Sequence, residues 1–183
     1  MQIAFEAYTV WGLVQGRVEA DSPLHDVLVA NDTVAVYDYR LTPLAPGPSG
    51  QQGSALVNVD DLLLVVAPPD TPAPVHAAWN ELTVTVGPFE VSGLLSTLPG
   101  FDPGRSLARP SSRLVLLSEV SVGLRDQPGF VVGKHSFAWV NRYDVDRVRS
   151  ELELPFYFPG AEREAPVPPV VASSIPTSVT AKG

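Results

Sequence analysis

The sequence predicts an all-β protein made of two tandem, related, small β-barrel-like repeats, each with one short helix at most. Three observations support this fold class: runs of valine, leucine and aromatic residues, turn residues between these runs, and segments of the first half that recur in the second. The expected organisation is a first β repeat over residues 1–67, a proline-rich linker over 68–80, a second β repeat over 81–160 and a disordered tail over 161–183.

The internal similarity begins with Tyr8–Val14 (YTVWGLV), which is matched 81 residues later by Phe89–Leu95 (FEVSGLL). Further matches follow in the same order along both halves: Val36 with Leu117 and Asp38 with Glu119 at the spacing of 81, and Ala55–Asn58 with Ala138–Asn141 at 83. A colinear series with one two-residue slip favours duplication of a small domain over a solenoid, whose repeats are about 20–50 residues long. Chance similarity between two valine-rich halves is the alternative.

Each expected element of the first repeat has a local reason. Residues 2–19 follow an imperfect alternation of apolar and polar side chains, as in a strand, and Gly12 and Gly16 predict a bend or bulge within it. A short helix is expected from Pro23 to Ala30, because Ser22 suits the N-cap and proline the first helical position. Further strands are predicted over residues 33–41, 54–59 and 62–66. The last of these is a continuous apolar run, typical of a strand covered on both faces and therefore expected between the two repeats.

The second repeat is expected to follow the same order with less helix. Its strands are predicted over residues 82–86, 89–95, 114–124 and 137–141. Residues 105–108 are expected to form one helical turn. Residues 143–154 fit a helix or a strand, and the repeat argument favours a strand for the first half of this segment. Pro155–Pro159 (PFYFP) is expected to form a compact aromatic plug.

In layout, the first repeat resembles the Sm-like family of small β-barrels, and more broadly the SH3-like barrels. Gly16–Asp21 (GRVEAD) lies where the Sm-like family has its glycine and aspartate, and Val57–Leu62 (VNVDDL) lies where it has its second signature. The family's asparagine after the aspartate and its Arg-Gly pair are missing, and the helix follows the first strand instead of preceding it. The resemblance therefore implies a barrel-like fold, and it carries no RNA-binding residues into this chain.

Composition excludes several classes of function. The formal net charge of −8 argues against nucleic-acid binding, which needs a lysine- and arginine-rich surface. The absence of cysteine excludes disulfides and thiolate chemistry and is compatible with the cytoplasm. No run of 18 apolar residues predicts a transmembrane helix, and the first residues lack the features of a signal peptide. We therefore expect a cytoplasmic protein, and the abundance of alanine, valine, glycine and proline suggests a bacterial source.

No catalytic or metal-binding motif is evident, so no catalytic residue, metal or cofactor is predicted. The three histidines, His25, His76 and His135, lack the spacing of metal ligands. The carboxylates of Asp60–Asp61 and Asp144–Asp146 could form a paired site with Asp21 or Asp102, but turns and strand edges are the more usual place for such residues. An enzyme is accordingly the third-ranked interpretation.

The favoured interpretation is a non-enzymatic protein-interaction or assembly module whose partner is itself or another protein. Aromatic residues and arginine are enriched at such interfaces. The interaction candidates are Trp11, Trp139, Phe156, Tyr157, Phe158, Arg142 and Arg147. The leading alternative is a regulatory domain that binds a small molecule in a cleft between the repeats. Its candidate ligand contacts are Asn58 and Asn141, polar residues inside apolar strands, for which capping of a turn is the other explanation.

Overall fold

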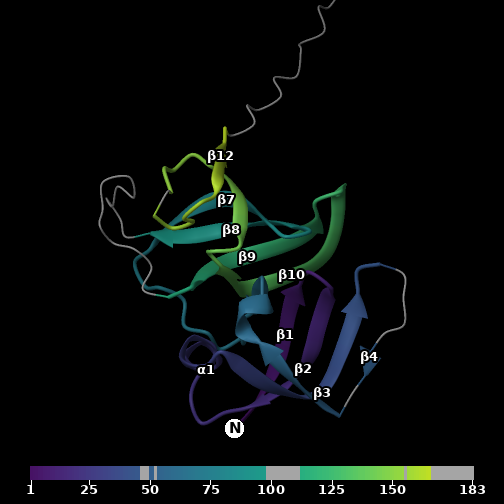
Figure 1. Ribbon diagram of the computed structural model, residues 1–183. Helices are drawn as coiled ribbons and strands as arrows, with labels where there is room; N and C mark the ends of the chain where they lie inside the picture. Colours follow the sequence, from purple (N-terminus) through teal and green to yellow (C-terminus); the bar gives the residue numbers. More distant parts are fainter. Residues whose placement is uncertain (46–49, 52, 98–111, 155, 166–183) are drawn as a thin grey trace, which may run out of the picture.

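The computed structural model describes residues 1–45, 50–51, 53–97, 112–154 and 156–165, which form a mostly β structure with one short α-helix (Figure 1). The strands are β1 (Gln2–Thr9), β2 (Gly12–Glu19), β3 (Thr33–Pro43), β4 (Gly50–Gln51), β5 (Ser54–Asn58), β6 (Leu64–Val66), β7 (Ala78–Val86), β8 (Phe89–Thr97), β9 (Leu114–Leu124), β10 (Gln127–Asn141), β11 (Val145–Ser150) and β12 (Glu162–Glu164). The helix α1 spans Leu24–Ala30, and a 3-10 turn, η1, spans Val59–Asp61.

All described strands belong to one sheet, in the order β12-β11-β7-β8-β9-β10-β6-β1-β2-β3-β4, with β5 also paired to β3. The sheet is mixed, because β12 runs parallel to β11 while the other pairings are antiparallel. The all-β prediction is confirmed, but the sheet is open and does not close into a barrel. The reason lies at β6, whose backbone pairs with β10 of the second half and with β1, and not with β5 of its own half.

The two halves repeat the same strand registers. In the first half Val36 pairs with Ala55, and in the second half Leu117 pairs with Ala138, which reproduces the spacings of 81 and 83 found in the sequence. The closing strands agree as well, since β6 pairs with β1 in the register in which β11 pairs with β7. From β3 onward, the sequence alignment therefore matches equivalent positions.

The first part of that alignment is wrong. The hairpin of β1 and β2 turns between Thr9 and Gly12, and the hairpin of β7 and β8 turns between Val86 and Phe89, which is a spacing of 77 instead of 81. Tyr8–Val14 thus crosses a hairpin turn, whereas Phe89–Leu95 lies wholly within β8. Apolar strands alternate with a period of two, so a shift by four residues still matches apolar side chains with one another.

Two clusters of buried side chains form the core, and β6 lies between them. Leu64 belongs to the cluster of the second half, whereas its neighbour Val65 belongs to the cluster of the first half, and neither is exposed. Successive side chains of a strand point to opposite faces, so one strand serves both clusters. This confirms the prediction that the run from Leu62 to Val66 is covered on both faces.

Several predicted boundaries change by a few residues. The helix begins at Leu24 instead of Pro23, and the segment after Tyr143 is the strand β11, as the repeat argument favoured. The tail was expected to be disordered from residue 161, but residues 162–164 form β12. The helical turn expected at residues 105–108, like the tail beyond residue 165, lies outside the described residues.

Candidate functional site

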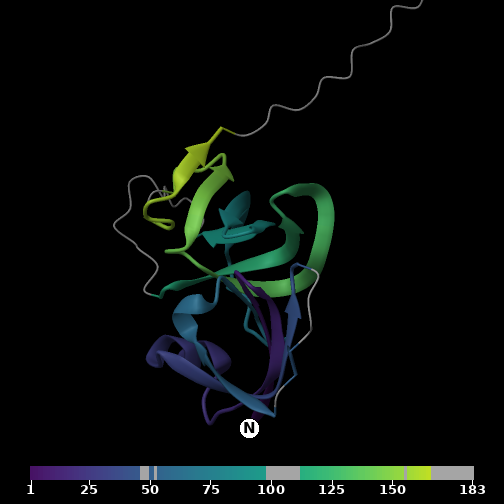
Figure 2. The same cartoon turned by 45° about the vertical axis from the view of Figure 1, so that its right-hand side comes forward.

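The two halves meet where the edge of β10 pairs with β6. Trp139 is opposite Val65 in this antiparallel ladder, with Ala138 opposite Val66 and Val140 opposite Leu64. The indole of Trp139 is only 6% exposed and packs into the cluster of the first half, 5.5 Å from the ring of His25. Both views show β10 running between the two halves (Figures 1 and 2). The junction therefore combines backbone pairing with insertion of one large apolar side chain.

β5 holds the same position in the first half that β10 holds in the second. Leu56 is opposite Ala35 of β3, as Trp139 is opposite Leu116 of β9. Across its other edge, however, β5 has no strand partner in the part of the chain that the structure describes. Leu56, on the outward face of β5, is 76% exposed. An unpaired strand edge with an exposed apolar side chain is a surface on which another strand can pair.

The opposite end of the sheet is covered by β12. Arg147, Val148 and Arg149 of β11 lie opposite Glu162, Arg163 and Glu164 in a short parallel ladder. Arg147 is 3.6 Å from Glu162 and 3.2 Å from Glu164, and Arg149 is 3.0 Å from Glu164.

These contacts lower the pKa of the Glu164 carboxylate. The hydrogen bond from Arg149 lowers it most, and Arg147 lowers it further. Ion pairs that are open to solvent in this way contribute little to stability. β12 therefore covers the outer edge of β11 but is held there only weakly.

The predicted aromatic candidates separate into exposed and buried groups. Trp11 is 58% exposed in the turn between β1 and β2, whereas Trp139 is buried in the junction. Phe158 is 1% exposed in the cluster of the second half, and Phe156 and Tyr157 are half-buried beside it. Phe158 thus belongs to the core of the second half and Tyr157 packs against it, on the segment that leads to β12.

The two arginine candidates have structural partners. Arg142 is 4% exposed, donates a hydrogen bond to the carbonyl of Phe156 at 2.8 Å, and stacks over the ring of Tyr143 at 5.1 Å. Arg147 is half-exposed and belongs to the ion pairs of β12. Of the two, only Arg147 lies near an end of the sheet, on β11 next to β12.

Asn58 and Asn141 occupy equivalent turns. The side-chain oxygen of Asn58 accepts a hydrogen bond from the Asp60 amide at 3.0 Å, and that of Asn141 accepts one from the Tyr143 amide at 3.3 Å. Capping of a turn is the explanation that the sequence offers for these residues beside ligand contact.

Asn141 also donates to the carboxylate of Asp144 at 2.6 Å. The pKa of Asp144 is raised by burial and then by the negative charge of Asp60, with smaller contributions from Asp146 and Asp61. The carboxylates that the sequence singled out thus influence one another electrostatically, while Arg113 forms an ion pair with Asp60 and opposes the shift. Asp102 lies outside the described residues.

A cleft of about 1010 Å³ lies beside the start of β1. β1 pairs with β6 only at Ala7 and Tyr8, so residues 2–6 have no strand on that side within the described chain, and residues 66–72 and α1 form the other walls. Its apolar lining includes Ile3, Phe5, Leu24, Val66, Leu116 and Trp139. The cleft touches both halves, as the small-molecule alternative requires, but it is lined by neither Asn58 nor Asn141.

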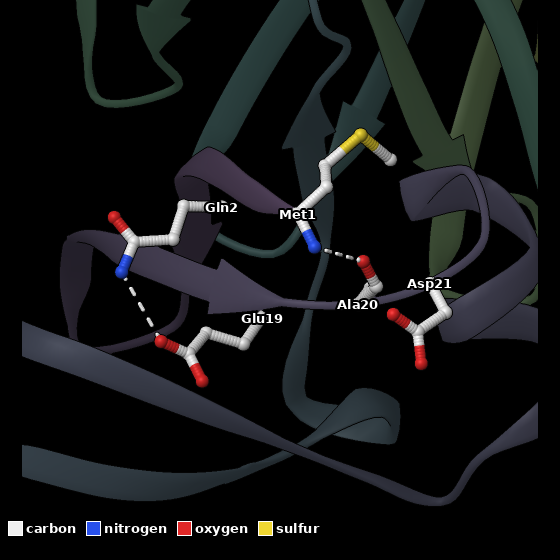
Figure 3. A pocket seen from close by; sticks show the side chains of 5 residues that line it. All are labelled: Met1, Gln2, Glu19, Ala20 and Asp21. Atoms are coloured by element: carbon white, nitrogen blue, oxygen red, sulfur yellow. Dashed lines mark hydrogen bonds between the residues drawn. The ribbon is translucent and has the colours of Figure 1, made fainter.

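A smaller depression of about 410 Å³ is lined by Met1, Gln2, Glu19, Ala20 and Asp21 (Figure 3). Two hydrogen bonds join residues that line it. The amino group of Met1 donates to the carbonyl of Ala20 at 2.8 Å, and the amide of Gln2 donates to Glu19 at 3.1 Å.

A polar network that no motif in the sequence predicts crosses the junction. The hydroxyl of Tyr8 lies 2.8 Å from Nε2 of His135, and Glu6 lies 3.7 Å from the same nitrogen and accepts a hydrogen bond from Gln15 at 2.8 Å. Burial, with Glu6 adding to it, raises the pKa of Tyr8 to about 12. Burial also lowers the pKa of His135, against the opposing effect of Glu6. Tyr8 and His135 are 127 residues apart, so only the pairing of the halves brings them together.

The described residues contain no cluster of three or more histidine or carboxylate groups that could hold a metal ion. The same part of the chain contains no helix long and apolar enough to cross a membrane. Comparison with family models, curated proteins and solved structures finds no match for this chain.

Proposed function

We propose that the protein is a non-enzymatic assembly module that self-associates through its sheet edges. The observation that carries this proposal is the edge of β5 that has no strand partner among the described residues, where Leu56 is 76% exposed, while the equivalent Trp139 of β10 is buried against another strand. In the part of the chain that the structure describes, the same position is thus paired in one half and unpaired in the other.

The proposal includes a duplicated five-strand unit, β1-β2-β3-β5-β6 in the first half and β7-β8-β9-β10-β11 in the second. The shared registers and the equivalent turns at Asn58 and Asn141 support it. In such a pair, the fourth strand of the second unit meets the last strand of the first unit. The fourth strand of the first unit is then left to meet a strand of another molecule.

The energetics suit a reversible association. Burial of a leucine side chain contributes about 1.5–3 kcal/mol, and backbone pairing adds to this. Loss of translational and rotational freedom opposes association by several kcal/mol or more. The expected assembly is therefore weak enough to depend on protein concentration.

Sedimentation velocity over a hundredfold range of concentration tests this function. The average mass of the wild-type chain should rise with concentration, and Leu56→Lys should keep it at the mass of one chain. Val75→Lys is the matched control, because Val75 is 79% exposed and lies outside every strand. Equal masses for the wild type and Leu56→Lys at all concentrations would refute the proposal.

A second candidate function is binding of a small apolar molecule, and the cleft beside β1 favours it. The probe 1-anilinonaphthalene-8-sulfonate should bind saturably with increased fluorescence. Ile3→Arg, which places a charge in the apolar wall, should abolish the increase. Val29→Arg, on the exposed side of α1 and outside the cleft, should preserve it. Unsaturable or equal binding by all three proteins would exclude the cleft as a specific site.

A further inference from the structure

We propose that assembly is head-to-tail, with β5 of one copy pairing antiparallel with β11 of the next, and that β12 is a displaceable cap on that acceptor edge. This inference rests on the proposed function and specifies its partner surface and its control. The β5 edge and the β11 edge are different surfaces. Each copy therefore carries one donor edge, β5, and one acceptor edge, β11.

The junction inside the chain supplies the template. There, β10 of one half pairs with β6 of the other, and Trp139 is opposite Val65. β5 corresponds to β10, and β11 corresponds to β6, because Val148 pairs with Val84 of β7 as Val65 pairs with Ala7 of β1. Transfer of the junction to two copies places Leu56 opposite Val148.

The side chains are suited to this register. Val65 belongs to the core cluster of its own half, and Trp139 enters that cluster from the other half. Val148 is likewise part of the core cluster of its own half and is 5% exposed. Leu56 would thus approach the second half as Trp139 approaches the first, with its exposed apolar surface directed toward a core cluster.

β12 occupies the acceptor edge in the structure. Figures 1 and 2 show it at the far end of the sheet from α1, in yellow, beside β11. Its ladder has three residue pairs and is parallel, whereas β5 offers five residues and would pair antiparallel. Of the ion pairs that hold β12, the pair of Arg147 with Glu162 is exposed, with Glu162 at 78% side-chain exposure, and the two pairs of Glu164 are half-exposed. The cap is therefore short enough and weakly enough held for a second copy to replace it.

The consequence for symmetry is specific. A donor edge that meets a different acceptor edge forms a heterologous contact, which produces a ring or an open chain of copies. Contact between two β5 edges would instead produce a closed dimer. The two arrangements respond differently to blocking one edge.

A disulfide between β11 and β12 blocks the acceptor edge without removing any segment. The pair Arg147→Cys and Glu162→Cys suits this purpose, because the two residues are opposite each other and the chain has no other cysteine. The matched control is Arg147→Ser with Glu162→Ser. Sedimentation velocity is measured for each protein with and without reductant, together with Leu56→Lys, which blocks the donor edge.

The oxidised cysteine variant should remain a single chain, and reduction should restore assembly. The serine control should assemble about fivefold or more strongly than the wild type in both conditions, because its cap has lost both ion pairs of Arg147, with Glu162 and with Glu164. An equimolar mixture of the oxidised variant and Leu56→Lys should form a one-to-one dimer and nothing larger, since one supplies β5 and the other supplies β11.

If the oxidised variant self-associates as the wild type does, or if the mixture contains only single chains, the head-to-tail inference is wrong. The proposed function would still hold in that case, provided that Leu56→Lys abolishes wild-type association. If wild-type chains do not associate at any concentration, both proposals fail.

Discussion

Asp38 and Glu119 adopt the same left-handed backbone conformation, each with a φ angle of 51°, although they are 81 residues apart. Each lies at a β-bulge in the third strand of its half, opposite Gly16 in the first case and Gly93 in the second. Bulges bend a strand and increase its twist. The third strands of the two halves therefore bend at equivalent positions, each through a β-bulge with a left-handed residue.

Replacement of Glu119 by glycine is predicted to stabilise the protein by about 0.5–1 kcal/mol. A residue with a Cβ atom is strained at this φ angle, and glycine is not, although the greater freedom of glycine in the unfolded chain offsets part of the gain. Urea unfolding measures the difference. Glu151→Gly is the control: Glu151 is also exposed, but its φ angle is not positive, so this change should destabilise the protein.

The repeat in the sequence matches Asp38 with Glu119, because strand composition and spacing are preserved from β3 to β11, but it does not predict the bulges at these residues. The sequence locates the turn between Val86 and Phe89 but not the one between Thr9 and Gly12, and alternating apolar residues match equally well after a shift of four positions. It also could not show that β6 pairs with β10, because edge pairing depends on backbone groups that are the same for every residue. Trp139 is buried where these strands pair, whereas Leu56, at the equivalent position of β5, is exposed.

Gly16→Ala is predicted to destabilise the protein by about 1–3 kcal/mol, the usual cost of overpacking. A Cβ atom at this position would lie 2.5 Å from Cγ1 of Val36 and 2.6 Å from the carbonyl oxygen of Tyr37, closer than real contacts allow. Thermal and urea unfolding provide the measurement. Gly53→Ala should have little effect, because no atom lies within 4 Å of its added Cβ. Similar stabilities for the two variants would contradict the close approach at the bulge.

Tyr8→Phe is predicted to lower the free energy of unfolding by about 1–2 kcal/mol. The tyrosine is 1% exposed, and removal of its hydroxyl leaves Nε2 of His135 without its 2.8 Å partner in a half-buried site. Tyr143→Phe is the control, because Tyr143 is 63% exposed. A loss no greater than that of the control would mean that the hydrogen bond contributes nothing to the junction.

The same histidine should make stability depend on pH. Burial lowers the pKa of His135 in the folded protein below its ordinary value of 6.5, with Glu6 opposing this effect. Between the two pKa values the unfolded chain binds more protons than the folded chain, so the free energy of unfolding rises with pH. The contribution of the neutral ring is complete above pH 6.5 and is lost progressively as the pH falls from 6.5 through the lower folded value.

Urea unfolding between pH 7.5 and 5.5 should therefore show a fall in stability that is weaker in His135→Gln, which keeps a polar side chain but does not titrate. Glu6→Gln makes the test sharper. Because the charge of Glu6 raises the pKa of His135, its removal should lower that pKa further and steepen the fall. An unchanged pH dependence in His135→Gln would assign the effect to other groups, and a shallower one in Glu6→Gln would contradict the electrostatic coupling of Glu6 to His135 across the junction.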